Sequence, residues 1–132
     1  KKINPLDDSE TATLILDADS GENYLGKKVY LVIRCQSSEV ELYIGWNNYL
    51  GSEALVTTRV GSNKAIKNYW SLSSDSQATF SRNSKKLIKE MLSKQKFVAQ
   101  VTPYSDSPVT AIFDISGIKN AIKPIFDICG KF

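Results

Sequence analysis

Hydrophobic and polar residues alternate along most of this chain. Between residues 11 and 18, Ala12, Leu14, Leu16 and Ala18 alternate with Thr11, Thr13, Ile15 and Asp17. A period of two is typical of a strand with one buried face. This alternation, or a short apolar run, predicts strands at residues 11–18, 28–35, 39–46, 54–60, 66–72, 78–80, 97–104 and 109–115. Residues 28–35 are apolar almost throughout, which predicts a central strand covered on both faces.

Short turns connect the predicted strands. Gly61, Ser62 and Asn63 form a hairpin signal, and Pro103 and Pro108 bracket a polar tip before the last strand. No long helical segments alternate with the strands, so we expect an antiparallel sheet. The sequence predicts a mainly β fold, an antiparallel β-sandwich or flattened barrel of seven to eight strands with two short helices in the C-terminal half. Residues 11–132 are expected to form this single domain, and residues 1–10 an N-terminal tail.

Helical spacing appears twice late in the chain. A first helix is predicted from a cap at Asn83 and Ser84 to about Ser93, with an apolar stripe of Leu87, Ile88, Met91 and Leu92. A second follows a cap at Ser116 and Gly117, and its predicted buried face consists of Ile118, Ala121, Ile122, Ile125, Phe126 and Cys129. Pro124 falls inside this second pattern and predicts a kink or a restart.

The two cysteines fall in these predicted core elements. Cys35 ends the most apolar strand, and Cys129 lies on the apolar face of the terminal helix. Their placement predicts one disulfide across 94 residues (129 − 35 = 94), with two buried free thiols as the alternative. The chain begins at Lys1 and its only methionine is Met91, so we expect that a signal peptide or another leading segment has been removed. No apolar run of about 18 residues occurs, so we expect no transmembrane segment.

Histidine is absent, which narrows the possible catalytic chemistry. Ser-His-Asp and Cys-His machinery and the commonest zinc ligands are excluded. Glu39 and Glu41 share one predicted strand face, where carboxylates more often solubilise an edge than flank a glycosidase cleft. Asp75, Asp106 and Asp114 fall at or near turns, without calcium-loop or phosphate-loop spacing. We therefore predict no enzyme, no catalytic residue, no metal and no cofactor.

Aromatic residues suggest a possible binding surface. Tyr43, Trp46, Asn47, Tyr49 and Tyr104 come from strand ends and loops where a platform for a sugar or a peptide could form. For the two tryptophans, Trp46 and Trp70, core packing is the interpretation that we favour. Tyr49, at a loop tip, is the residue that we expect to be exposed.

Lysines suggest a possible basic patch. Lys85, Lys86, Lys89 and Lys96 lie on the first predicted helix and just beyond it, which would suit a polyanion. We favour the interpretation that they form the solvated face of an amphipathic helix, because Glu90 interrupts the run. Aromatic residues that would stack bases are missing from this segment, so we expect no nucleic-acid partner.

A series of motifs resembles a known family. Leu31-x-Ile33-Arg34-Cys35 and Trp46 are followed by W-S-L-S-x-D-x-x-A-T-F over residues 70–80, T-P-Y-x-x-x-P-V-T-A-x-F-D-x-x-G over residues 102–117, and Cys129. Over about residues 11–129 this series resembles the VasI (TagO) family, proteins associated with bacterial type VI secretion, and related exported proteins. The resemblance implies an exported accessory protein of the bacterial envelope, periplasmic or secreted, with no catalytic residues to carry over.

The sequence leads to one expected function and leaves two alternatives open. We expect a non-catalytic accessory or binding protein with a protein partner in the envelope. A cell-wall-active enzyme that works without histidine is the first alternative, and a polyanion-binding module is the second.

Overall fold

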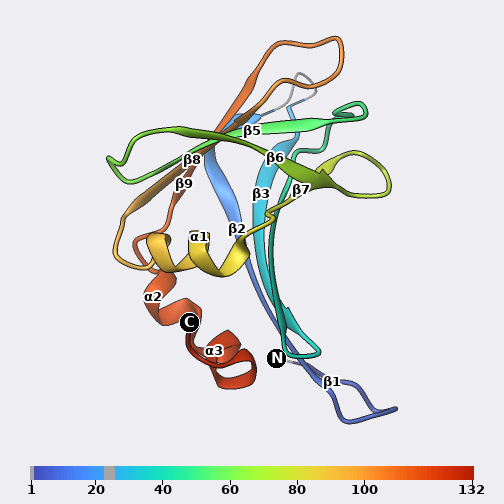
Figure 1. The fold of residues 1–132 in the computed structure, drawn as a ribbon, viewed down its shortest axis with the longest axis vertical. Coiled ribbons are helices and arrows are strands. Elements are labelled where there is room, and N and C mark those ends of the chain that lie inside the picture. The colour runs from blue at the N-terminus through green and yellow to red at the C-terminus, as the bar shows by residue number, and fades with distance from the viewer. Residues whose placement is uncertain (1, 23–25) are drawn as a thin grey trace.

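The computed structural model describes residues 2–22 and 26–132, and Figure 1 shows their arrangement. The described strands are β1 (Lys2–Ile3), β2 (Glu10–Glu22), β3 (Lys28–Gln36), β4 (Glu39–Gly45), β5 (Ala54–Val60), β6 (Ile66–Leu72), β7 (Ala78–Phe80), β8 (Lys96–Val101) and β9 (Val109–Asp114). The described helices are α1 (Ser84–Met91), α2 (Ile118–Ala121) and α3 (Lys123–Cys129).

Eight of these strands close into an antiparallel barrel. Neighbours follow the order β2-β3-β4-β7-β6-β5-β8-β9, and β9 returns to β2 where Ile112 pairs with Ser20. The mainly β prediction is confirmed, and the barrel form is observed because β2 pairs with both β3 and β9. β1 adds an extra short strand, since Lys2 and Ile3 pair with β2 inside the segment predicted as a tail.

The closure of the barrel depends on a glycine in β2. This strand pairs with β3 over residues 11–17 and then shifts register before it reaches β9. At Gly21, with φ of +105°, a Cβ atom would collide with the backbone of Thr110 and Ala111. A residue without a side chain is therefore needed where the two strands meet.

The barrel interior holds the apolar side chains that the alternation predicts. The largest fully buried ones include Trp46, Phe97, Phe113, Leu31, Ile33, Leu42 and Ile44. On β3, Leu31, Val32 and Ile33 are all almost inaccessible, which confirms a central strand covered on both faces. β8 ends at Val101, three residues earlier than predicted, because Pro103 cannot donate to a ladder and restricts Thr102.

Helix α1 packs against the barrel wall where β7 ends (Figure 1). The Ser81 N–H donates to the Leu42 carbonyl over 2.9 Å, and the Leu42 N–H donates to Ser84 Oγ over 3.0 Å. Ile88 and Met91 are fully buried, as the predicted stripe requires. Asn83 takes the N-cap position but makes no side-chain cap hydrogen bond, and the hydroxyl of the neighbouring Ser84 accepts from the Leu42 N–H of β4.

The terminal helical segment restarts at its proline. α2 ends at Ala121, and α3 begins at Lys123 with Pro124 in its first turn, as one of the two predicted outcomes. Ile122 and Ile125 are buried, whereas Phe126 and Cys129 are only partly buried and Ala121 is exposed, so the predicted buried face is too wide. The break between the helices explains the partial exposure of Phe126 and Cys129. A restart at Lys123 changes the direction in which the residues of α3 point, relative to one continuous helix. Gly117 rather than Ser116 occupies the N-cap of α2, without a side-chain cap.

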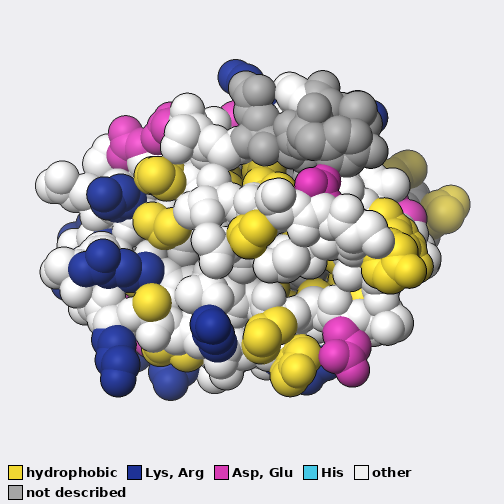
Figure 2. Space-filling model, turned by 90° about the horizontal axis from the view of Figure 1, so that it is seen from above, with side chains coloured by type: hydrophobic (Ala, Val, Ile, Leu, Met, Phe, Trp, Pro, Cys, Tyr) yellow, Lys and Arg dark blue, Asp and Glu magenta, His cyan; other side chains and the backbone are white. Residues whose placement is uncertain are grey.

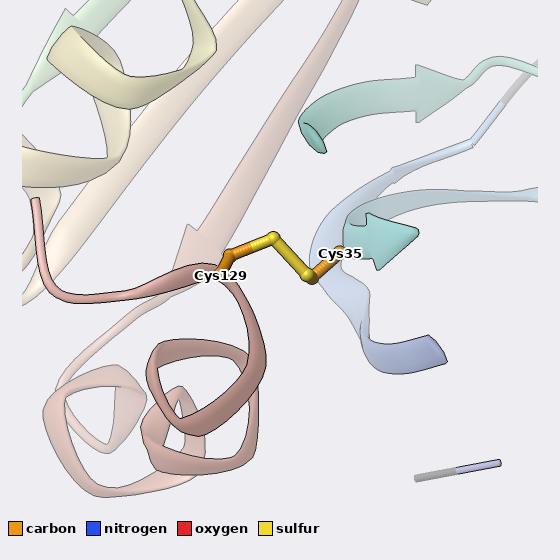
Figure 3. Close-up of a disulfide and its surroundings, with 2 residues drawn as sticks. All are labelled: Cys35 and Cys129. Carbon is orange, nitrogen blue, oxygen red and sulfur yellow. A yellow bond between two sulfur atoms is a disulfide. The ribbon is translucent and has the colours of Figure 1, made fainter. Parts of the chain in front are cut away.

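Cys35 and Cys129 are joined in a disulfide, as their placement predicts. Their Cα atoms lie 6.0 Å apart, within the usual range for a disulfide. Figure 3 shows the bond linking the end of α3 to the end of β3. Among the described residues, no helix is long and apolar enough to cross a membrane.

Candidate functional site

Strand β6 is the most accessible part of the barrel wall. Its first five residues pair with β5 on one side, from Ile66 opposite Thr58 to Trp70 opposite Ala54. On its other side only Ser71 and Leu72 pair with β7. Within residues 2–22 and 26–132, the first five residues of β6 therefore have no strand beside them on that edge.

The edge is open because β7 is short. After Phe80 the chain turns through Ser81 and Arg82 into α1 instead of continuing beside β6. Arg82 Nε reaches back only to Ser71 Oγ, over 3.3 Å.

The register identifies the backbone groups on the open edge. The Ser73 N–H donates to the Ala78 carbonyl, so Ser73 and Ala78 form a hydrogen-bonded pair. Such pairs recur at every second residue of an antiparallel ladder, so Ser71 and Phe80 form the next hydrogen-bonded pair. Backbone groups of alternate residues point to the same side of a strand. The N–H and C=O of Lys67 and Tyr69 therefore point to the open edge, while those of Asn68 point to β5.

A groove lies beside this edge, between the β5–β6 hairpin and α1, and we call it the β6–α1 groove. Its cavity volume is about 330 Å³, close to the lower limit for ligand pockets. Its apolar lining comes from Val60, Ile66, Trp70 and Leu87, and its polar lining from Thr58, Asn63, Lys64, Asn68, Ser81, Asn83, Lys86 and Glu90. The lining of the groove therefore combines four apolar side chains with polar and charged ones.

Large apolar side chains are exposed on both faces of β6. Ile66 is 53% exposed on the face toward the groove, and Tyr69 is 52% exposed on the opposite face. Leu55, the cross-strand partner of Tyr69, is also exposed. An edge strand that leaves backbone groups without a strand partner and exposes apolar side chains on both faces is typical of a contact surface. A protected sheet edge is short, charged or covered instead.

Positive charge dominates around the β5–β6 hairpin. Arg59, Lys64 and Lys67 of the hairpin are exposed, and Lys86 of α1 lines the groove beside a single acidic residue, Glu90. Figure 2 shows Lys and Arg side chains gathered toward the left of the molecule, the side on which β5 turns back into β6 in Figure 1. This charge favours an acidic partner.

The predicted aromatic surface is divided between three places. Trp46 is fully buried and donates from Nε1 to Thr79 Oγ1 over 3.0 Å, which confirms core packing and removes it from the candidate surface. Tyr43 lies on the outer wall, where its ring stacks on Phe80 at 4.7 Å. This separation follows from strand alternation, because Tyr43 and Trp46 point to opposite faces of the wall.

The remaining three residues lie at loops. Tyr49 is exposed as predicted, and its ring packs edge to face with that of Tyr104 at 5.9 Å between centroids. The Tyr104 N–H donates to the Tyr49 carbonyl, which ties the two loops together. Asn47 is partly buried, and its Nδ2 donates to the Lys28 carbonyl over 2.7 Å.

The lysines of the predicted basic patch point in different directions. Lys85, Lys86 and Lys89 are exposed on α1, and Lys96 is exposed at the start of β8. Lys86 lines the β6–α1 groove, whereas the Lys85 ammonium lies over the Phe132 ring at 5.8 Å from its centroid. The patch is thus not one surface, and only Lys86 belongs to the groove.

Several of the carboxylates that the sequence singles out have ion-pair or hydrogen-bond partners. Glu41 forms an ion pair with Arg34 on the outer wall, at 2.5 Å. Hydrogen bonds from the Ser73 hydroxyl and the Gln77 N–H hold the pKa of Asp75 below its ordinary value. Bonds from Ser116, first from its side chain and then from its backbone, likewise lower the pKa of Asp114. A general acid at neutral pH needs the opposite shift. No group of three potential metal ligands occurs among the described residues.

Sequence reasoning missed the residues that the groove brings together. Ile66 and Asn68 read as one face of an ordinary strand, and the sequence shows no sign that this face stays uncovered. The one available signal is the length of the predicted strand at residues 78–80, which is too short to cover a seven-residue neighbour.

Comparison with protein-family models, with curated proteins and with solved structures finds no match to this chain. Within the described residues, the fold and the site thus define a closed antiparallel barrel in which strand β6 has an open edge beside a helix.

Proposed function

We propose that this protein is an exported, non-catalytic binding module of the bacterial envelope and that its partner is another protein. The observation that carries this proposal is the exposure of β6 on both faces and along one edge. Strand edges left open in this way pair readily with another polypeptide.

Two observations support an exported protein. The Cys35–Cys129 disulfide suits an oxidising compartment such as the periplasm. The resemblance of the motif residues to the VasI (TagO) family implies the same compartment and an accessory role. Type VI secretion is therefore the context that we propose for the partner.

A binding role fits the charged groups better than catalysis does. Hydrogen bonds lower the pKa of Asp75 and of Asp114, Glu41 is paired with Arg34, and none of these three carboxylates lines the β6–α1 groove. Hydrogen bonds and ion pairs of this kind are common for carboxylates at the turns and strands of ordinary protein surfaces, and they do not by themselves indicate catalysis.

Photocrosslinking in the bacterium that produces the protein tests the proposal. A photoreactive amino acid replaces Lys67 on β6, and in a matched control it replaces Thr13, exposed on β2 across the barrel. We expect a discrete protein adduct from position 67 in the periplasmic fraction and none from position 13. Equal adducts from both positions, or none from either, would contradict a β6 binding surface.

Incubation with purified peptidoglycan tests the non-catalytic part. We expect no released fragments by chromatography. Fragments that disappear in a Glu41→Gln or an Asp75→Asn variant would instead establish a cell-wall enzyme.

A further inference from the structure

We propose that the open edge of β6 binds an extended polypeptide segment as an added strand. An apolar side chain of this segment enters the β6–α1 groove, and acidic side chains beside it meet Lys64 and Lys86. The inference rests on the proposed function and specifies its binding mode and the chemistry of the partner. In strand addition, main-chain hydrogen bonds provide affinity and pockets for alternate side chains provide specificity.

The added strand takes the position that a longer β7 would occupy. Lys67 and Tyr69 each offer one N–H and one C=O on this edge, and antiparallel neighbours pair with alternate residues in this way. Pairing with β5 already holds β6 extended, so binding does not need to order the accepting strand.

The groove selects the side chains of the added strand. Residues that lie opposite each other on paired strands point to the same face of the sheet. A residue opposite Asn68 therefore points toward the groove, where Val60, Ile66, Trp70 and Leu87 provide apolar contacts. A cavity of about 330 Å³ is large enough for an aliphatic or aromatic side chain, and these four residues give such a side chain apolar contacts.

Charge favours an acidic segment over a second copy of this chain. Pairing of β6 with β6 of a second copy would bring the two sets of Lys64, Lys67 and Lys86 together, and like charges at close range oppose association. An acidic segment meets the same lysines with opposite charge.

Selection from a phage-displayed library of random 12-residue peptides tests the proposal, with the intact disulfide-bonded protein as bait. We expect selected peptides with alternating apolar residues and with Asp or Glu beside them. Synthetic copies should bind more weakly as salt increases, because the charged contacts are exposed to solvent. Failure to select any binding peptide would overturn the proposal.

Variants of the protein locate the bound peptide. Tyr69→Pro removes an N–H that points to the open edge and leaves the bonds to β5, so we expect a Kd about threefold to tenfold weaker, while Tyr69→Phe keeps the wild-type Kd. Lys86→Glu should weaken binding, whereas Lys85→Glu, on the neighbouring residue outside the groove, should not. Equal affinities of wild type and Tyr69→Pro would contradict strand addition.

A change in the peptide serves as a control that does not depend on the folding of the variants. N-methylation of single peptide amides should weaken binding at alternate positions only, in the pattern of a strand. Uniform tolerance would overturn the proposal. Peptides whose NMR shifts map to Tyr49 and Tyr104 would leave a binding function standing and exclude the β6 mode. A dimer that Tyr69→Pro dissociates would show a second copy to be the occupant instead.

Discussion

Tyr69 unites the features on which the proposed site depends. Its ring is half exposed on the outer face, its backbone groups point to the open edge, and its cross-strand partner Leu55 is exposed as well. Asp75 shows the opposite situation, because its carboxylate is satisfied within its own turn. The Ser73 hydroxyl donates to Asp75 Oδ1 over 2.6 Å and the Gln77 N–H donates over 3.1 Å.

Ser73→Ala should raise the pKa of Asp75 toward its ordinary value, because the side-chain hydrogen bond is the largest cause of the lowered pKa. In the wild type the lowered pKa contributes stability above the pKa of the unfolded chain, and this contribution is lost as pH falls through the folded pKa. Carboxyl-carbon NMR titration measures the change, with Ser74→Ala as the control. An unchanged pKa in Ser73→Ala would refute the assigned cause.

At the scale of elements, hydrophobic periodicity predicts the strands well because each wall strand has one face in the barrel interior. The alternation of Val109, Ala111 and Phe113 against Thr110 and Asp114 marks β9 correctly for this reason. Periodicity does not predict how far neighbouring strands overlap, and the open edge of β6 arises entirely from the point at which β7 ends. Periodicity likewise does not predict that the loops of Tyr49 and Tyr104 pack together while Tyr43 lies apart on the outer wall.

Substitutions in the terminal helices test how firmly they are docked. Ile122 is fully buried, so Ile122→Ala should lower the unfolding free energy by about 2 to 5 kcal/mol. Truncation of a fully buried phenylalanine to alanine costs about 3 to 5 kcal/mol. Because Phe126 is only partly buried, Phe126→Ala should lower the unfolding free energy by less than this. Urea denaturation measures both.

Lys119→Ala, at an exposed position of α2, is the matched control and should change stability by less than about 0.5 kcal/mol. Unchanged unfolding of Ile122→Ala would mean that the helices detach from the barrel, and their apolar face would then become a second candidate surface.

At the scale of the whole molecule, the disulfide joins the C-terminal helix α3 to the end of strand β3. It spans 94 residues between β3 and α3. The chain-entropy model assigns about 4 to 5 kcal/mol to a loop of this length, so the Cys35→Ser/Cys129→Ser double variant should lose up to about that much stability.

Intact-mass analysis of natively purified protein checks the bond itself. Alkylation should modify neither cysteine until a reductant is added. Modification of both thiols without reductant would contradict the disulfide and, with it, the support for an oxidising compartment.

Amide hydrogen exchange in the free monomer tests the open edge of β6 most directly. The N–H groups of Lys67 and Tyr69 should exchange at rates close to those of an unstructured chain, because they point away from β5. The N–H groups of Asn68 and Trp70 should exchange much more slowly, because they bond to β5. Equal protection of all four amides in a monomer would show that the edge is covered and would contradict β6 as the binding surface.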